Sequence, residues 1–213
     1  MKSFFYGLIL ILWVFSLPLI AQEKGMVQNE RSHGFVFEPS LEFQFRNLKK
    51  GTYLGDTYQL GLGYSVSLGL RYDKFPGIAL VVGGQGASLQ ENRFLGNFFE
   101  QARLRERGVL VYHQFKVTQR LSFLTDFGLG WMTLNHGYGL SRFALNFNVL
   151  QGSGGFSYRI FENERGKLPV NLFIKIRYGG LNGREIVINP TDRNYVQGST
   201  QILGSIGCQV QLH

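Results

Sequence analysis

The sequence is short of cysteine, proline and charge. Its single cysteine, Cys208, excludes an internal disulfide bond, so the chain is not a small secreted domain held together by disulfides. Only five prolines and 17% charged residues accompany 28 glycines and 15% aromatic residues. That mixture favours an all-β protein whose strands carry small residues on one face.

Long apolar runs are also scarce, and the only one lies at the N-terminus. The run begins at Phe4, after Met1, Lys2 and Ser3, and reads FFYGLILILWVFSLPLIA. It ends on the small Ala21, before the polar QEKGMVQNERSH. These features predict a signal peptide over residues 1–21, with an uncleaved anchor as the alternative. We expect a polar segment over 22–33 and one domain over 34–213. Beyond the run nothing approaches the ~20 apolar residues of a spanning helix, so any membrane crossing must use strands.

The balance of charge is basic, with a formal net charge of +8. A basic exterior can meet anionic lipid headgroups or nucleic acid. Because a secreted chain seldom meets nucleic acid, we expect the charge to face lipid and expect no nucleic-acid partner.

Apolar residues recur at every second position, which predicts eight strands and no helix between them. The expected strands cover residues 35–47, 58–72, 77–90, 108–117, 121–134, 144–161, 170–178 and 200–212. The connections between them alternate between long and short, as in a meander of hairpins. In the sixth strand Leu145, Phe147 and Val149 have the opposite parity to Phe156 and Tyr158, which predicts a β-bulge near residues 152–155.

The stretch from Tyr58 to Tyr72 indicates whether the apolar face of the strands points into the barrel or out of it. Leu, Val and Tyr occupy its even positions, and mainly Gly and Ser its odd positions. The small polar face would make a poor soluble surface, and eight apolar faces exceed what a narrow barrel can hold. We therefore expect the apolar face to point outward into lipid. The eight residues from Tyr64 to Tyr72 span about 20 Å along a tilted barrel, close to the height of a lipid-facing band.

Aromatic residues at the ends of the apolar faces predict a girdle at each lipid–water interface. The residues expected there are Tyr64, Tyr72, Trp131, Tyr158 and Tyr178.

Taken together, the signal peptide, the eight alternating strands, the short turns and the last strand SIGCQVQLH resemble the small OmpA/OmpX-type outer-membrane β-barrels of Gram-negative bacteria. The resemblance implies an eight-stranded antiparallel up-and-down transmembrane barrel in the bacterial outer membrane. It places both termini in the periplasm and the wall against outer-membrane lipid and lipopolysaccharide. Gly207, Val210 and Leu212 resemble the signal by which the barrel-assembly machinery recognises such proteins, although Ile206 and His213 depart from that pattern.

Charged residues on the polar strand faces would point into such a barrel. Buried charges need partners, so we expect a salt-bridge network that fills the lumen together with Tyr112, Met132 and Phe173. A substrate-specific pore is the alternative. The charged residues expected in the network are Glu38, Glu42, Arg46, Arg71, Lys116, Asp126, Arg159, Lys175 and Arg177.

The expected loop over residues 91–106 mixes aromatic residues with arginines. That mixture suits lipopolysaccharide phosphates or a partner protein, and a loop packed on itself is the alternative. The candidate contacts are Arg93, Phe94, Phe98, Phe99, Arg103 and Arg105.

Catalytic motifs are absent from the sequence. The lipid A deacylases use a His, a Ser two residues later and an acidic partner. Here the residue two positions after His136 is Tyr138, and the residue two positions after His113 is Phe115. We expect His136 in a loop, no metal site and no cofactor. The sequence thus predicts a non-enzymatic outer-membrane barrel with a structural, adhesion or partner-binding role carried by its extracellular loops. A lipid A acylhydrolase-like enzyme and a soluble lipocalin-like carrier, which would need an apolar lumen, are the alternatives.

Overall fold

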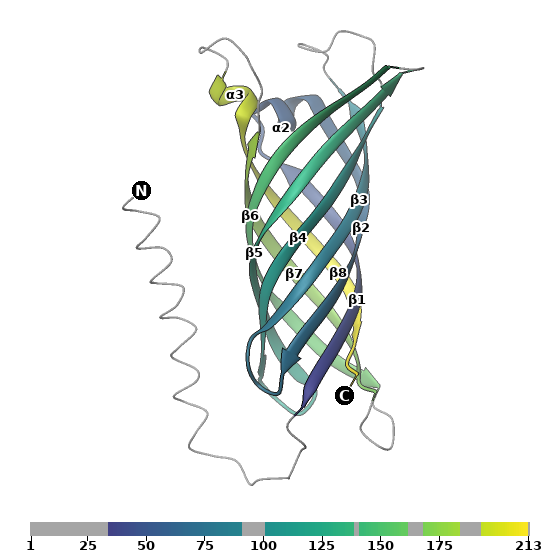
Figure 1. The fold of residues 1–213 in the computed structure, drawn as a ribbon, viewed down its shortest axis with the longest axis vertical. Coiled ribbons are helices and arrows are strands. Elements are labelled where there is room, and N and C mark those ends of the chain that lie inside the picture. Colours follow the sequence, from purple (N-terminus) through teal and green to yellow (C-terminus); the bar gives the residue numbers. More distant parts are fainter. Residues whose placement is uncertain (1–33, 91–100, 139–140, 162–167, 184–192, 213) are drawn as a thin grey trace, which may run out of the picture. The chain divides into compact units, whose positions relative to one another are not determined.

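Eight antiparallel strands close into a barrel in their order along the chain (Figure 1). The computed structural model describes residues 34–90, 101–138, 141–161, 168–183 and 193–212. The strands are β1 (Phe35–Leu48), β2 (Tyr58–Tyr72), β3 (Gly77–Leu89), β4 (Gln101–Lys116), β5 (Leu121–Tyr138), β6 (Ser141–Phe161), β7 (Val170–Gly183) and β8 (Gly198–Val210). The predicted eight-stranded antiparallel barrel is confirmed.

Closure of the barrel gives β1 two partners. Phe43 pairs with Tyr64 of β2 on one side and with Ile206 of β8 on the other. With every strand paired on both sides, the barrel has no open sheet edge, which is what a β-structure surrounded by lipid needs.

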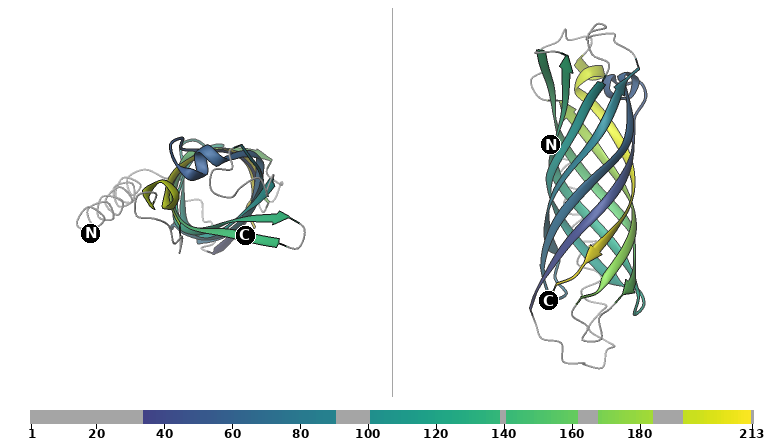
Figure 2. Two further views of the ribbon diagram at one scale, coloured as in Figure 1. Left: turned by 90° about the horizontal axis from the view of Figure 1, so that it is seen from above. Right: turned by 90° about the vertical axis from the view of Figure 1, so that its right-hand side faces the viewer.

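The two ends of the barrel differ. One end, here called the turn end, carries the short connections at 73–76 and 117–120 and an isolated bridge between Phe37 and Leu212. The other, the helix end, carries the helices α2 (Tyr53–Thr57) and α3 (Arg193–Gln197) (Figures 1 and 2). The expectation of no helix between the strands is therefore wrong, because helices of five residues are too short to show a helical period in the sequence. Neither helix is long and apolar enough to cross a membrane, and the described residues contain no other that is.

Strands reach further toward the helix end than the sequence predicts. β4 begins at Gln101 rather than residue 108, and β5 and β6 continue to Tyr138 and Ser141. Their hairpin protrudes past the barrel rim in the view along the axis (Figure 2). Parts of the expected loops at 91–106 and 135–142 are therefore strand.

The predicted bulge in β6 is wrong, because β6 pairs with β5 without a break from Tyr158 to Ser141. A register shift against β7 falls later, between Arg159 and Phe161.

A second register shift interrupts β2, between Leu60 and Gly63. There the strand changes parity, so that Tyr58 is buried inside the barrel whereas Leu62 and Tyr64 are exposed outside. The side-chain amide of Gln85 donates a hydrogen bond to the carbonyl of Gly61 at this bulge. The unbroken alternation expected from Tyr58 to Tyr72 therefore holds only from Leu62 onward.

Candidate functional sites in the lumen and on the outer wall

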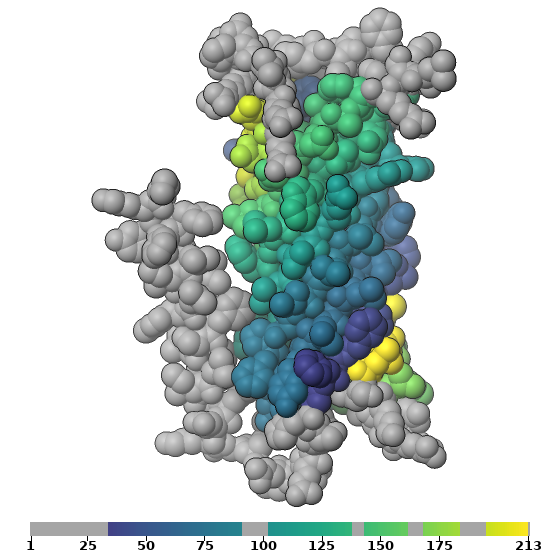
Figure 3. All heavy atoms as spheres, viewed as in Figure 1, coloured from purple at the N-terminus to yellow at the C-terminus, as the bar shows by residue number. Residues whose placement is uncertain are grey.

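The outer wall carries an apolar band that begins at the turn end. On β7 it includes Leu172, Ile174 and Ile176, and along β8 it runs from Ile202 past the end of the strand to Leu212. A stretch of that length spans about 24 Å along a barrel axis at a tilt of ~45°. Figure 3 shows one face of this closely packed wall.

Beyond the band, toward the helix end, the outward positions become polar or lack a side chain. They include Gly84, Arg103, Arg105, Arg107, Thr133, Asn146, Asn148 and Asn182. We call this part of the barrel the outer section, and the part inside the band the band section.

All five residues expected in the aromatic girdle lie exposed on the outer wall. Tyr64, Trp131 and Tyr178 lie near the border between the band and the outer section, whereas Tyr72 and Tyr158 lie near the turn end. The Tyr64 ring covers Gly84, where a Cβ atom would be 3.3 Å from the tyrosine oxygen.

A buried carboxylate, Glu42, lies at the centre of the lumen of the band section. Its oxygens lie 3.1 Å from Lys175 Nζ and 3.4 Å from Arg177 Nη2. They also accept hydrogen bonds from Gln44 at 2.6 Å and Ser65 at 2.7 Å. Asp126 lies within 3.6 Å of Lys175 and 3.9 Å of Arg177, so both cations are shared between two carboxylates.

Two further ion pairs flank this centre. Arg46 pairs with Glu106 and donates to the side-chain oxygen of Gln201 at 2.9 Å. Arg71 Nε lies 3.0 Å from Glu38, which also accepts a hydrogen bond from Gln211.

Nine charged residues were expected in this network, and seven of them belong to these ion pairs. Lys116 is exposed at the turn end and Arg159 is half-buried, and neither is among the ion pairs described above. Glu106 was missed because the sequence placed it in a loop. The alternation of Ala102, Leu104 and Glu106 with arginines is the signal that could have found it.

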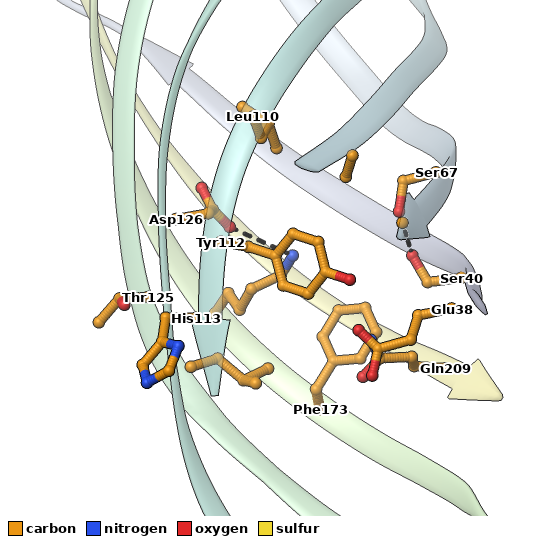
Figure 4. Close-up of a pocket in the computed structure, with 14 residues that line it drawn as sticks. Glu38, Ser40, Ser67, Leu110, Tyr112, His113, Thr125, Asp126, Phe173 and Gln209 are labelled. Carbon is orange, nitrogen blue, oxygen red and sulfur yellow. Dashed lines mark hydrogen bonds and ion pairs between the residues drawn. The ribbon is translucent and has the colours of Figure 1, made fainter. Parts of the chain in front are cut away.

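Two aromatic residues fill lumen space that glycines leave open. The Tyr112 ring lies against Gly69 and Gly77, where a Cβ atom would come within 2.8 Å and 2.5 Å of ring atoms or the hydroxyl. Phe173 covers Gly207 in the same way. Between these rings and Asp126 there remains a cavity of about 50 Å³, shown in Figure 4.

Most of the side chains inside the outer section are apolar. Met132 and Leu134 are 0% exposed, and Phe147 and Val149 are 1% exposed. Tyr53 and Leu54 of α2 and Val196 of α3 belong to the same cluster, which we call the outer core. Leu145, Phe147 and Val149 therefore face inward rather than toward lipid as the sequence suggested.

A hydrogen-bonded chain of three side chains crosses the outer core. The Tyr58 hydroxyl lies 2.7 Å from His136 Nε2 and 3.3 Å from the Tyr53 hydroxyl, and His136 Nδ1 lies 3.2 Å from the Phe143 carbonyl. The arrangement fits a neutral histidine that donates from Nδ1 and accepts at Nε2. Burial lowers the pKa of His136 and raises the pKa of Tyr53, which keeps both groups uncharged near neutral pH.

The two candidate catalytic histidines, His136 and His113, lie on opposite faces of the barrel wall. His136 is on β5 and faces the outer core, so the expectation of a loop position is wrong. His113 faces outward on β4, with its ring 4.3 Å from that of Phe115. Among the described residues, no group of His, Cys, Asp and Glu could hold a metal ion.

The arginines expected in a loop lie partly on a strand. Arg103 and Arg105 are exposed on the outer face of β4, and Arg107 continues the row up to the apolar band at Val109. Sequence reasoning missed Arg107. The other candidate loop contacts, Arg93, Phe94, Phe98 and Phe99, lie outside the described residues.

The three residues of the expected assembly signal lie on both faces of β8 and of the short stretch that follows it. Gly207 faces inward, where a Cβ atom would lie 2.3 Å from the Leu41 carbonyl oxygen, and Val210 and Leu212 are on the outward parity. Packing alone thus requires glycine at 207.

No protein-family model and no curated protein matches the chain. Among solved structures, Neisserial surface protein A is similar, with 15% sequence identity, a TM-score of 0.51, and coverage of 86% of this chain and 99% of that one. OprG from Pseudomonas aeruginosa is similar at 12% identity and a TM-score of 0.50, covering 88% and 100%. The chain therefore has the fold of the small eight-stranded outer-membrane β-barrels.

Proposed function

We propose that this protein is a non-enzymatic barrel of the bacterial outer membrane whose structural, adhesion or partner-binding role is carried by its extracellular side. The observation that carries the proposal is the apolar band, whose exposed Leu, Ile and Phe side chains would be insoluble in water and are stable against lipid. In this arrangement the helix end is extracellular, and both chain termini are periplasmic. The barrel-assembly machinery would recognise β8.

The filled lumen supports a role in which no ion or substrate passes through the barrel. The ion pairs around Glu42 fill the band section, and the outer core fills the section beyond it with side chains that water does not reach. Substrates would have to displace both layers to pass. Specific contacts therefore fall to the outer wall and to the extracellular loops, toward lipopolysaccharide or a partner protein.

A lipid A acylhydrolase-like activity is less well supported. Its histidine would have to reach lipid from the outer wall, whereas His136 is buried inside the barrel against Tyr58. A soluble lipocalin-like carrier would fit the apolar interior of the outer section. Its side chains fill that interior, however, and the exposed apolar band would remain in water.

Cell fractionation and bilayer recordings test the proposal. We expect the protein in the outer-membrane fraction, with heat-modifiable migration on gels and no stepwise conductance in planar bilayers. Recovery in the periplasm without detergent would contradict the membrane position, and steady conductance would contradict the closed lumen. A changed lipid A profile on expression, lost in His136→Ala, would favour the enzyme instead.

A further inference from the structure

We propose that the outer wall across β4 to β7 binds one phosphorylated, acylated glycolipid of the lipid A class, with its phosphates on Arg103, Arg105 and Arg107. An acyl chain of the same molecule would lie in the hollow beside Gly180. The inference rests on the proposed membrane position and names the partner of the outer wall.

The arginine row is built for an anion. The three guanidinium groups are exposed on one face of β4 at every second residue, so that neighbours are about 7 Å apart. None of them forms an ion pair or a side-chain hydrogen bond within the part of the chain that the structure describes. Like charges this close repel each other, and a bound anion would relieve that repulsion. Three guanidiniums in a row favour a ligand with more than one phosphate over a lipid with a single one.

A hollow lies on the same wall, where the apolar band meets the outer section. It measures about 290 Å³, with Leu129, Leu150 and Gly180 on its apolar side and the amides of Asn148 and Asn182 on its polar side. A Cβ atom at Gly180 would meet nothing within 4 Å. The hollow continues the apolar band, so an acyl chain can enter it from the lipid, and the two amides can donate to its carbonyl group.

Strand pairing places the row and the hollow side by side. Trp131 pairs with Arg107 on one side and with Asn148 on the other, and Asn148 pairs with Asn182. Arg107 and Asn182 are thus three strands apart, about 14 Å. A single headgroup that carries both phosphates and acyl chains can span that distance, whereas free phosphate would use only the arginine row.

The test measures lipid binding to the full chain in nonionic micelles by native mass spectrometry. The variants are Arg103→Gln/Arg105→Gln/Arg107→Gln and Gly180→Leu, and the charge-matched control is Lys49→Gln/Lys50→Gln/Lys74→Gln, which changes three exposed lysines elsewhere. We expect the unmodified protein to bind lipid A about tenfold more tightly than its dephosphorylated form. The arginine variant should lose that preference, Gly180→Leu should weaken binding of both forms, and the control should change neither.

Equal binding of lipid A by the arginine variant and the unmodified protein would overturn the proposal. So would equally tight binding of phosphatidylglycerol, which would make the row a general anionic surface, or a Gly180→Leu variant that binds both forms normally. Heat-modifiable migration in phosphatidylcholine vesicles is measured for each variant. A chain that inserts but shows no preference contradicts only this inference, whereas a chain that does not insert contradicts the proposed function.

Discussion

The band section and the outer section use the same strands with opposite polarity. On β6, Phe156 and Tyr158 face outward in the band section, whereas Phe147 and Val149 face inward in the outer section. The alternation of the strand never breaks between them, and only the face that carries the apolar residues changes. The comparison teaches that an alternation of apolar and polar residues identifies a strand but does not show whether its apolar face points into the barrel or out of it.

Each section is held together by the forces that its proposed surroundings allow. In the proposed membrane position lipid would cover the wall of the band section, so the polar side chains gather inside and must pair with one another. The wall of the outer section would lie beyond the lipid tails, and burial of apolar side chains inside drives the packing there as in a soluble protein. β2 joins the two sections through its bulge at residues 60–63, and β6 joins them by a change in residue type alone.

The largest expected effect comes from breaking the charge network of the band section. Glu42→Leu would remove one of the two carboxylates that share Lys175 and Arg177 and leave both cations within 4 Å of Asp126. We expect the free energy of unfolding, measured by urea denaturation in vesicles, to fall by about 3–5 kcal/mol. The double variant Glu42→Leu/Lys175→Met removes a charge of each sign and should lose less than the sum of the single variants. Strict additivity would show that the pair is not coupled.

The next prediction places one new charge on the outward face of each section. Ile174→Arg puts a guanidinium in the middle of the apolar band and should lower the free energy of unfolding by about 2–4 kcal/mol. Asn146→Arg puts the same group on the wall of the outer section and should change it by less than about 0.5 kcal/mol. Both effects are measured by the same urea titration. Equal effects at the two positions would contradict the claim that only the band section faces lipid.

The smallest predicted effect concerns the bulge that joins them. Gln85→Ala removes the hydrogen bond to the Gly61 carbonyl and should cost about 1 kcal/mol. Ser88→Ala on the same strand removes only a long, exposed bond of 3.4 Å to the Gln59 carbonyl and is the matched control, with no expected change. If both variants unfold at the same urea concentration as the unmodified protein, Gln85 does not stabilise the bulge.

Sequence reasoning succeeded where a pattern is local. The eight strands, the inward parity of Glu38, Glu42, Arg71 and Arg177, and the outward parity of Tyr64 and Tyr178 follow from period two. It failed at the helix end, where Glu106 and Arg103 were assigned to a loop and Leu145 to Val149 to the lipid side. At the helix end the outward residues are charged or polar, and such a composition is also typical of a loop. The inward residues there are apolar, and such a pattern is also typical of a strand face that contacts lipid.

The sequence by itself determined that each strand has two faces, because alternating side chains point to opposite sides of any extended backbone. Only the tertiary structure decided which face is inside at each height, since that depends on how far the residue lies along the closed barrel. The partners in the lumen were decided there as well. Arg46 pairs with Glu106 and donates to Gln201, residues that are distant in the chain and meet only when β1, β4 and β8 close around one interior.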